Sequence, residues 1–178
     1  MTDRVAQIQA EWRRERPDLD TSPQGLVGRL HRLANHLTEE IVAVYARHGL
    51  SEGEFDVLAA LRRAGAPYER AAGDLASHTM VTTGAITKRV DRLVAAGLVE
   101  RRRADDDGRG RRIALTPAGL VLIDAAFAEH MANEQRLVSV LTPADRELLE
   151  PLLTRWLGAF EAPPLSPSRP RTSAPTPG

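Results

Sequence analysis

The segment "LVERRRADDDGRGRRIALTPAG", residues 98–119, holds six arginines and four acids in a chain whose formal net charge is zero. In its first half, residues 99, 101 and 103 alternate with 98, 100 and 102, which is the periodicity of a strand. The central "DDDGRG" is typical of a turn, and "RRIALT" follows it as a return strand. The segment therefore predicts a β-hairpin that carries arginines on both strands.

Helical patterns flank this hairpin on both sides. Apolar residues recur every three or four positions, Ser51 and Glu54 form a capping-box pattern, and Pro17 and Gly49 mark helix ends. Pro151 lies inside the last pattern and is expected to kink or restart that helix. The expected helices cover about residues 2–16, 23–49, 51–65, 70–77, 82–96, 117–141 and 143–161.

The order of these elements predicts a mainly α fold with a small β wing, that is, a winged helix-turn-helix domain with terminal dimerisation helices. The flanking apolar stripes exceed what one small domain can bury, so we expect a homodimer. Its two DNA-binding domains would contact the two halves of a pseudo-palindromic DNA operator. The expected parts are an extra N-terminal helix at the dimer or ligand pocket (1–17), dimerisation helices (18–49 and 117–161), the DNA-binding domain (50–116) and a disordered Pro-rich tail (162–178).

Composition argues against several other classes of protein. The chain has no cysteine, which excludes a disulfide framework, a thiolate zinc site and a thiol redox sensor. Its five histidines are scattered without an HxxxH pair, so no metal site is predicted. Neither a membrane-spanning run nor a signal peptide is visible, and we expect a cytoplasmic protein. No nucleophile motif, phosphate loop or suitably spaced carboxylate pair indicates an enzyme or a cofactor.

Basic charge is concentrated where double-stranded DNA would be read. Residues 86–112 carry a net charge of +4, so the rest of the neutral chain is negative, as expected of a local phosphate-binding surface. On a helix over 82–96, Ile86, Val90, Leu93 and Val94 point inward, and Gly84, Lys88, Asp91, Arg92 and Ala95 point outward. The predicted DNA-contacting residues are Thr82, Thr83, Gly84, Thr87, Lys88, Arg92, Arg109 and Arg111.

This region resembles the multiple-antibiotic-resistance regulator (MarR) family of dimeric winged-helix transcription factors. The resemblance lies in "GAITKRVDRLVAAGLVERRRADDDGRGRRIALTPAG", with "GLVER", a D-x-R-G element at Asp107, Arg109 and Gly110, and "LTPAG". It extends over nearly all of residues 20–160 and implies a ligand-responsive repressor. Gly108 departs from the family, where another arginine is common, so entry into the minor groove depends on Arg109 alone.

Four further residues are similar to the urate-responsive branch of that family: Trp12, Asp56, Arg89 and Arg101. The resemblance implies that Trp12, Arg89 and Arg101 hold a small anion, with Asp56 displaced or repelled on binding. Urate, related purine-pathway molecules, polycarboxylates such as aconitate, and aromatic acids all suit such a pocket. The ligand would release DNA by favouring a DNA-incompetent arrangement.

Two alternatives remain open from the residues alone. Trp12 could simply anchor its helix, and Asp56 with Arg89 could form a structural pair, which would leave a DNA-binding regulator without a sensor site. The winged helix could instead serve protein contacts only. Salt dependence separates the second alternative, because a protein that neutralises phosphates loses DNA affinity steeply as salt is added.

Overall fold

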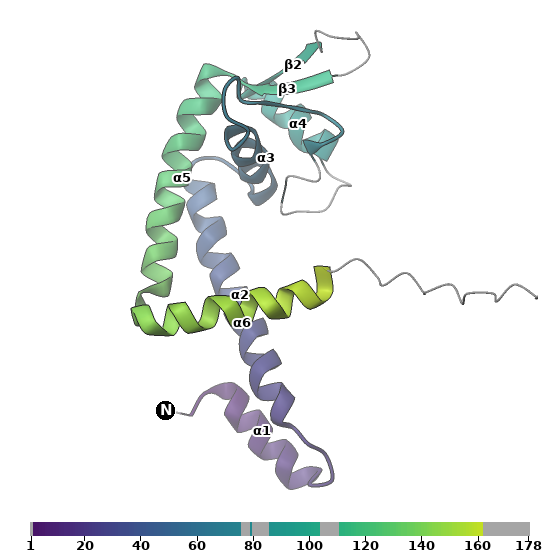
Figure 1. The fold of residues 1–178 in the computed structure, drawn as a ribbon, viewed down its shortest axis with the longest axis vertical. Coiled ribbons are helices and arrows are strands. Elements are labelled where there is room, and N and C mark those ends of the chain that lie inside the picture. The colour runs from purple at the N-terminus through teal and green to yellow at the C-terminus, as the bar shows by residue number, and fades with distance from the viewer. Residues whose placement is uncertain (1, 76–78, 80–85, 104–110, 162–178) are drawn as a thin grey trace, which may run out of the picture. The chain divides into compact units, whose positions relative to one another are not determined.

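The computed structural model describes residues 2–75, 79, 86–103 and 111–161, and the chain divides into two compact units, 1–137 and 138–178 (Figure 1). The first unit is mainly helical with one three-stranded antiparallel sheet, which confirms the predicted fold class. Its elements are α1 (Arg4–Glu15), α2 (Ser22–Arg47), α3 (Glu52–Arg62), β1 (Glu69–Ala71), α4 (Ile86–Ala95), β2 (Val99–Arg103), β3 (Arg111–Leu115) and α5 (Pro117–Leu137).

Side chains and a glycine mark the helix ends; the Ser51–Glu54 capping box and Gly49 were predicted, and the Asp3 cap was not. The Asp3 carboxylate accepts a hydrogen bond from the Ala6 N–H at 2.8 Å and so caps α1. At α3, the Glu54 carboxylate accepts from the Ser51 N–H at 2.9 Å, within the predicted capping box. Gly49 adopts a φ of +70° just after α2, a conformation that glycine reaches at little cost.

A short strand replaces the beginning of the helix expected over 70–77. Glu69–Ala71 form β1, which pairs with β3 and completes a sheet of order β1-β3-β2. Arg70 reinforces the strand by donating from Nε to the Ala60 carbonyl of α3 at 2.9 Å. The helix prediction was therefore wrong for these residues, because pairing with a distant strand outweighed the local pattern.

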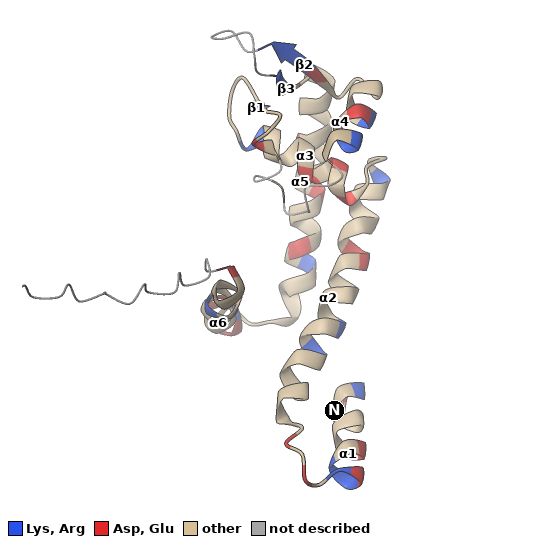
Figure 2. Cartoon of the chain, turned by 90° about the vertical axis from the view of Figure 1, so that its right-hand side faces the viewer, with Lys and Arg blue, Asp and Glu red and all other residues tan. Residues whose placement is uncertain are grey.

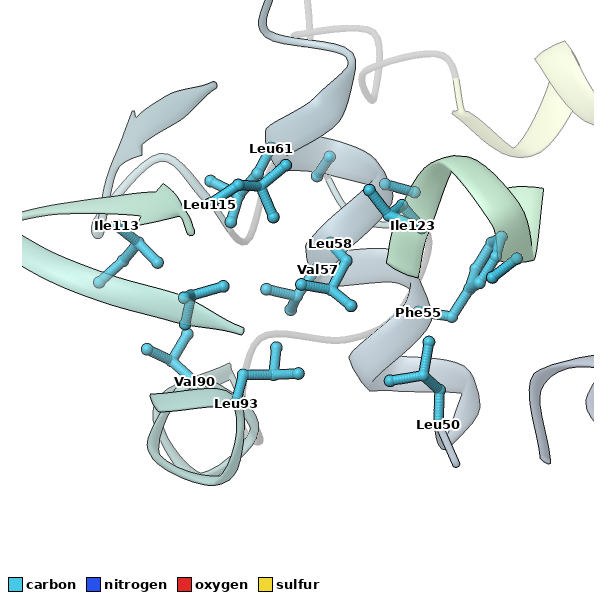
Figure 3. Packing of buried hydrophobic residues seen from close by; sticks show 14 of the residues in the cluster. Leu50, Phe55, Val57, Leu58, Leu61, Val90, Leu93, Ile113, Leu115 and Ile123 are labelled. Atoms are coloured by element: carbon cyan, nitrogen blue, oxygen red, sulfur yellow. The ribbon is translucent and has the colours of Figure 1, made fainter. Parts of the chain in front are cut away.

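One hydrophobic core joins α3, α4, the sheet and α5 (Figure 3). Leu58 and Leu61 of α3 lie at its centre and are fully buried, with Leu93 of α4, Ile113 of β3 and Ile123 of α5 around them. Burial of a large aliphatic side chain contributes about 1.5–3 kcal/mol. The core therefore fixes α4 and the wing relative to α3.

The α1–α2 pair packs closely through small residues. Gln9 of α1 is buried and donates to the Thr21 carbonyl at 2.8 Å. A Cβ at Gly28 of α2 would lie 3.2 Å from Val5, so the glycine lets the helices approach. These contacts place α1 along the N-terminal half of α2, whereas Tyr45 at the other end of α2 stacks on Phe55 of α3.

Large apolar side chains remain exposed on the long helices. Leu26 and Leu33 of α2 are 66% and 51% exposed in the protomer, and Val121 of α5 is 72% exposed. In the second unit, α6 (Pro143–Glu161) follows the short 3₁₀ helix Val138–Val140 and has no buried residue. The helix continues through Pro151, so of the two expected effects, a kink or a restart, the restart does not occur. No helix of the described part of the chain is long and apolar enough to cross a bilayer.

Candidate functional site

Helix α4 presents a polar face beside the wing. Ile86, Val90 and Leu93 point into the core, as predicted, but Val94 is 36% exposed and does not belong to the buried face. Val94 lies at the margin of the apolar stripe, which is narrower than the periodicity suggested. Lys88 is exposed and free to meet a ligand or a phosphate. Of the predicted DNA-contacting residues, Thr82, Thr83, Gly84 and Arg109 lie outside the described residues.

Ion pairs hold α4 on both flanks. On one flank, Arg92 donates from Nε to Glu54 Oε1 of α3 at 2.7 Å. Burial opposes ionisation of Glu54, but hydrogen bonds from Ser51 and Arg92 prevail and hold its pKa below the usual value. On the other flank, Arg101 of β2 donates to Asp91 of α4 at 2.6 Å. Arg92, which was predicted to contact DNA, therefore forms an ion pair with Glu54 of α3 within the protomer.

A hollow of about 200 Å³ lies between α4 and the wing. Thr87 and Val90 of α4 line one side, and Arg101 and Arg111 of the two long strands line the other. Lys and Arg account for most of the colour on β2 in Figure 2. Thr87 of α4 and Arg111 of β3, which were both predicted to contact DNA, therefore line the same basic hollow.

Arg89 lies against the first turn of α3, on the flank of α4 that faces that helix. A Cβ at Gly53 would lie 2.2 Å from Arg89 Nε, so the guanidinium occupies the space that a side chain would fill. Arg89 Nη1 is buried and has no hydrogen-bond partner among the described residues. Asp56, one turn after Gly53, is buried with 7% exposure and acts electrostatically on Tyr45. The first N–H groups of a helix also lack intrahelical acceptors. We call this surface, formed by Gly53, Asp56 and Arg89, the Arg89 niche.

The four predicted ligand residues do not meet within one protomer. Trp12 is 47% exposed and lines a shallow hollow with Leu19 and Gln24, at the N-terminal end of α2. Val44, which joins the core near α3, lies twenty residues beyond Gln24 along α2, or about 30 Å at 1.5 Å per residue. Figure 1 shows α1 and α3 at opposite ends of α2. Trp12 is therefore far from the Arg89 niche of its own protomer.

Arg101 is also separate from the niche. It pairs with Asp91, which lies 200° around α4 from Arg89 at 100° per residue, so the two arginines flank opposite sides of the helix. Of the other three residues, Asp56 is the one that lies on the helix Arg89 contacts, one turn of α3 after Gly53.

Several residues that shape this site escaped the sequence analysis. Gly53 had a signal, because a glycine in a helix is unfavourable and indicates a packing requirement. Glu54 was expected as a helix cap and Asp91 as an outward-facing residue, but their ion pairs had no signal in the sequence, since the partners come from other elements. His130 is also buried, and its ring lies 5.2 Å from that of Phe55, centroid to centroid. The described residues contain no group of three histidines or acids that could hold a metal ion.

Comparison with known proteins places these features in context. A model described as "MarR family" matches residues 48–110. The HTH-type transcriptional regulator PecS of Dickeya dadantii is 36% identical over 151 residues, which cover 85% of this chain and 91% of PecS. The HTH-type transcriptional regulator MhqR of Bacillus subtilis is 29% identical over 131 residues, covering 73% of this chain and 86% of MhqR.

A solved structure extends the likeness to a DNA complex. A variant of Escherichia coli MarR, complexed with operator DNA, has a TM-score of 0.65 and 27% identity, and the match covers 78% of this chain and 99% of that one. The relatives that match are thus transcriptional regulators, aligned over most of their length.

Proposed function

This chain belongs to the MarR family of winged helix-turn-helix transcriptional regulators, and we propose that it is a repressor that binds a pseudo-palindromic operator as a homodimer and leaves it when a small anion binds. It is a regulator rather than an enzyme. The DNA-binding part of the proposal is supported by the hollow that Thr87, Arg101 and Arg111 line, by the exposed Lys88 of the same helix, and by the operator complex of the similar E. coli protein.

The exposed apolar residues of the long helices support a dimer. Leu26, Leu33 and Val121 are more than half exposed, and α6 exposes Leu152, Trp156 and other apolar side chains. Such surface is unfavourable in water, and contiguous patches of it mark interfaces. A two-fold dimer would present two copies of α4 and the wing to successive turns of one duplex.

The buried, unpartnered Nη1 of Arg89 carries the ligand part of the proposal. A buried charged donor without an acceptor is costly, so an anion that accepts from Arg89 would be bound with a strong charge-assisted hydrogen bond. The positive end of the α3 helix dipole favours the same charge. Urate, a related purine-pathway anion or a small carboxylate metabolite has the required acceptors.

Trp12 and Arg101 join the niche in this proposal only through assembly or rearrangement. Trp12 lies about 30 Å along α2 from the end that packs on α3, so it would be supplied by the other protomer. Arg101 would first have to leave Asp91, to which it donates at 2.6 Å. Opening this pair would loosen the wing from α4, which links ligand binding to DNA release.

The test is a gel shift of the full-length protein on the intergenic DNA upstream of its own gene. Urate, aconitate and an aromatic acid are titrated separately into the complex. Release by one anion and not by the others supports the proposal and identifies the ligand class. Absence of DNA binding in dilute buffer, or binding that added salt does not weaken, would instead support a winged helix used for protein contacts.

Arg89→Ala tests the niche itself. The variant should retain operator binding and lose release by the active anion, because it removes the buried donor. Arg62→Ala is a matched control, since it also removes one arginine, but from the last residue of α3, where Arg62 pairs with Asp124 of α5 at 2.7 Å. If Arg89→Ala releases DNA at the same anion concentration as the wild type, the niche is not the binding site.

A further inference from the structure

The register of the wing sorts its arginines onto two faces. Ile113 of β3 is 1% exposed and stands directly opposite Arg101, so this face of the sheet points toward the core and α4. Arg103 and Arg111 are paired two residues further along the strands and therefore share that face. Arg101 and Arg111 accordingly line the hollow beside Thr87.

The opposite face holds a second pair of arginines. Arg102 and Arg112 stand directly across from each other, an arrangement in which like charges repel. Glu69 of β1 contacts both: its carboxylate oxygens lie 3.5 Å from Nη1 of Arg102 and 3.3 Å from Nη1 of Arg112. Glu100 accepts from Arg102 Nε at 2.8 Å. Two glutamates thus balance the two arginines of this outer face.

Glu69 is well placed to retain its partners. Its side chain is 17% exposed, whereas those of Arg102 and Arg112 are 46% and 44% exposed. Because β1 lies outside the hairpin and pairs with β3, Glu69 reaches Arg102 and Arg112 from a third strand of the sheet. Among the described residues, by contrast, no acid forms an ion pair with Arg103 or Arg111.

We propose that Glu69 is a positioning residue for DNA binding: it keeps Arg102 and Arg112 on the outer face of the wing, so that Arg103 and Arg111 supply the phosphate contacts. The inference rests on the DNA-binding function proposed above. Arginine contacts to phosphate strengthen binding to any sequence. By withholding two of the five arginines of β2 and β3 from phosphate, Glu69 limits affinity for unrelated DNA and preserves discrimination in favour of the operator.

The test measures how the affinity of the full-length protein for a duplex of unrelated sequence depends on salt. Each phosphate contact contributes about 0.9 to the slope of log affinity against log salt, or about 1.8 for the two protomers of a dimer. Arg103→Gln and Arg111→Gln should each reduce the slope by about this amount. The matched variants Arg102→Gln and Arg112→Gln should leave it unchanged.

Glu69→Gln should act in the opposite direction. Its freed arginines would add about 1.8 or more to the slope and raise affinity for the unrelated duplex, so the preference for operator DNA falls. Adding Arg102→Gln and Arg112→Gln to Glu69→Gln should restore the wild-type slope, because it removes the arginines that were freed. A residue that merely stabilised the sheet would lower the melting temperature without changing the slope.

Two results would overturn the inference: equal loss of slope in the Arg102 and Arg103 variants, or a Glu69→Gln slope identical to that of the wild type. Either result would leave the proposed function intact, provided the wild-type protein binds DNA with a steep salt dependence. A wild-type protein that binds no duplex in dilute buffer would refute the proposed function instead.

Discussion

Replacing Gly53 by alanine should weaken the anion response by displacing Arg89, without replacing any ligand-binding residue. The added Cβ would lie 2.2 Å from Arg89 Nε, 2.4 Å from Cζ and 2.7 Å from Cδ. Ordinary contacts of a Cβ begin at 3.4 Å, so the Arg89 side chain must withdraw by more than about 1 Å. The backbone of α3 is fixed by the core, and the flexible guanidinium is the group that moves.

The expected size of the effect follows from the bond that is lost. A hydrogen bond involving charged groups contributes about 1.5–3 kcal/mol, so anion affinity should fall roughly 10- to 150-fold. Stability should change little, because alanine is a better helix former than glycine by up to about 1 kcal/mol, and this offsets the displacement of one side chain. The variant should therefore fold and bind DNA like the wild type.

The assay is anion-induced release of DNA, followed by fluorescence anisotropy of a labelled operator duplex. Gly158→Ala is the matched control, since Gly158 is a helical glycine of α6 whose added Cβ would meet nothing within 4 Å. The control should respond to the anion like the wild type. If Gly53→Ala does so as well, at unchanged anion concentration, then contact between Arg89 and α3 does not build the binding site.

Two further predictions concern the fold that supports the site. Gly119→Ala places a Cβ 1.9 Å from the Leu98 carbonyl oxygen, which is backbone and cannot withdraw, so urea denaturation should show a loss of about 1–3 kcal/mol. Burial, and then the charges of Glu134, Glu52 and Asp56, raises the pKa of Tyr45 to about 12. This pKa exceeds the unfolded value of about 10, so the neutral Tyr45 phenol makes its full contribution to the free energy of unfolding below pH 10. The free energy of unfolding should then fall as the pH rises from 10 toward 12. Ultraviolet titration of the phenolate should show this late transition and its loss in Tyr45→Phe, whereas a phenolate at pH 10 in the folded protein would contradict the burial argument.

Much of the fold could be predicted because its signals are local. The capping pair Ser51 and Glu54, the apolar stripe of α2 and the strand alternation after Gly97 each depend on residues a few positions apart. The strand β1 has no such signal. It is only three residues long, and Glu69 pairs with Ala114 across a large sequence separation, so its stability comes from β3 and not from its own sequence.

The charged residues of the site were found from their spacing, but their partners were not. Arg92 joins Glu54 across 38 residues, and Arg101 joins Asp91 across the turn between α4 and β2. Helix periodicity gives the direction of a side chain on its own element, and it correctly predicted that Ile86, Val90 and Leu93 face the core. It says nothing about which acid approaches from another element.

Helix α4 couples the two halves of the proposed function because it belongs to both. Arg89 and Lys88 are adjacent on one rigid helix, so a movement that serves the niche also moves the surface offered to DNA. Arg92 joins the same helix to α3 and Asp91 joins it to the wing. A movement of α4 would therefore have to break or preserve these two ion pairs. The anion can shift operator occupancy only by the difference between its affinities for the free and the DNA-bound arrangements. An anion that bound both equally would leave the operator occupied, however tightly Arg89 held it.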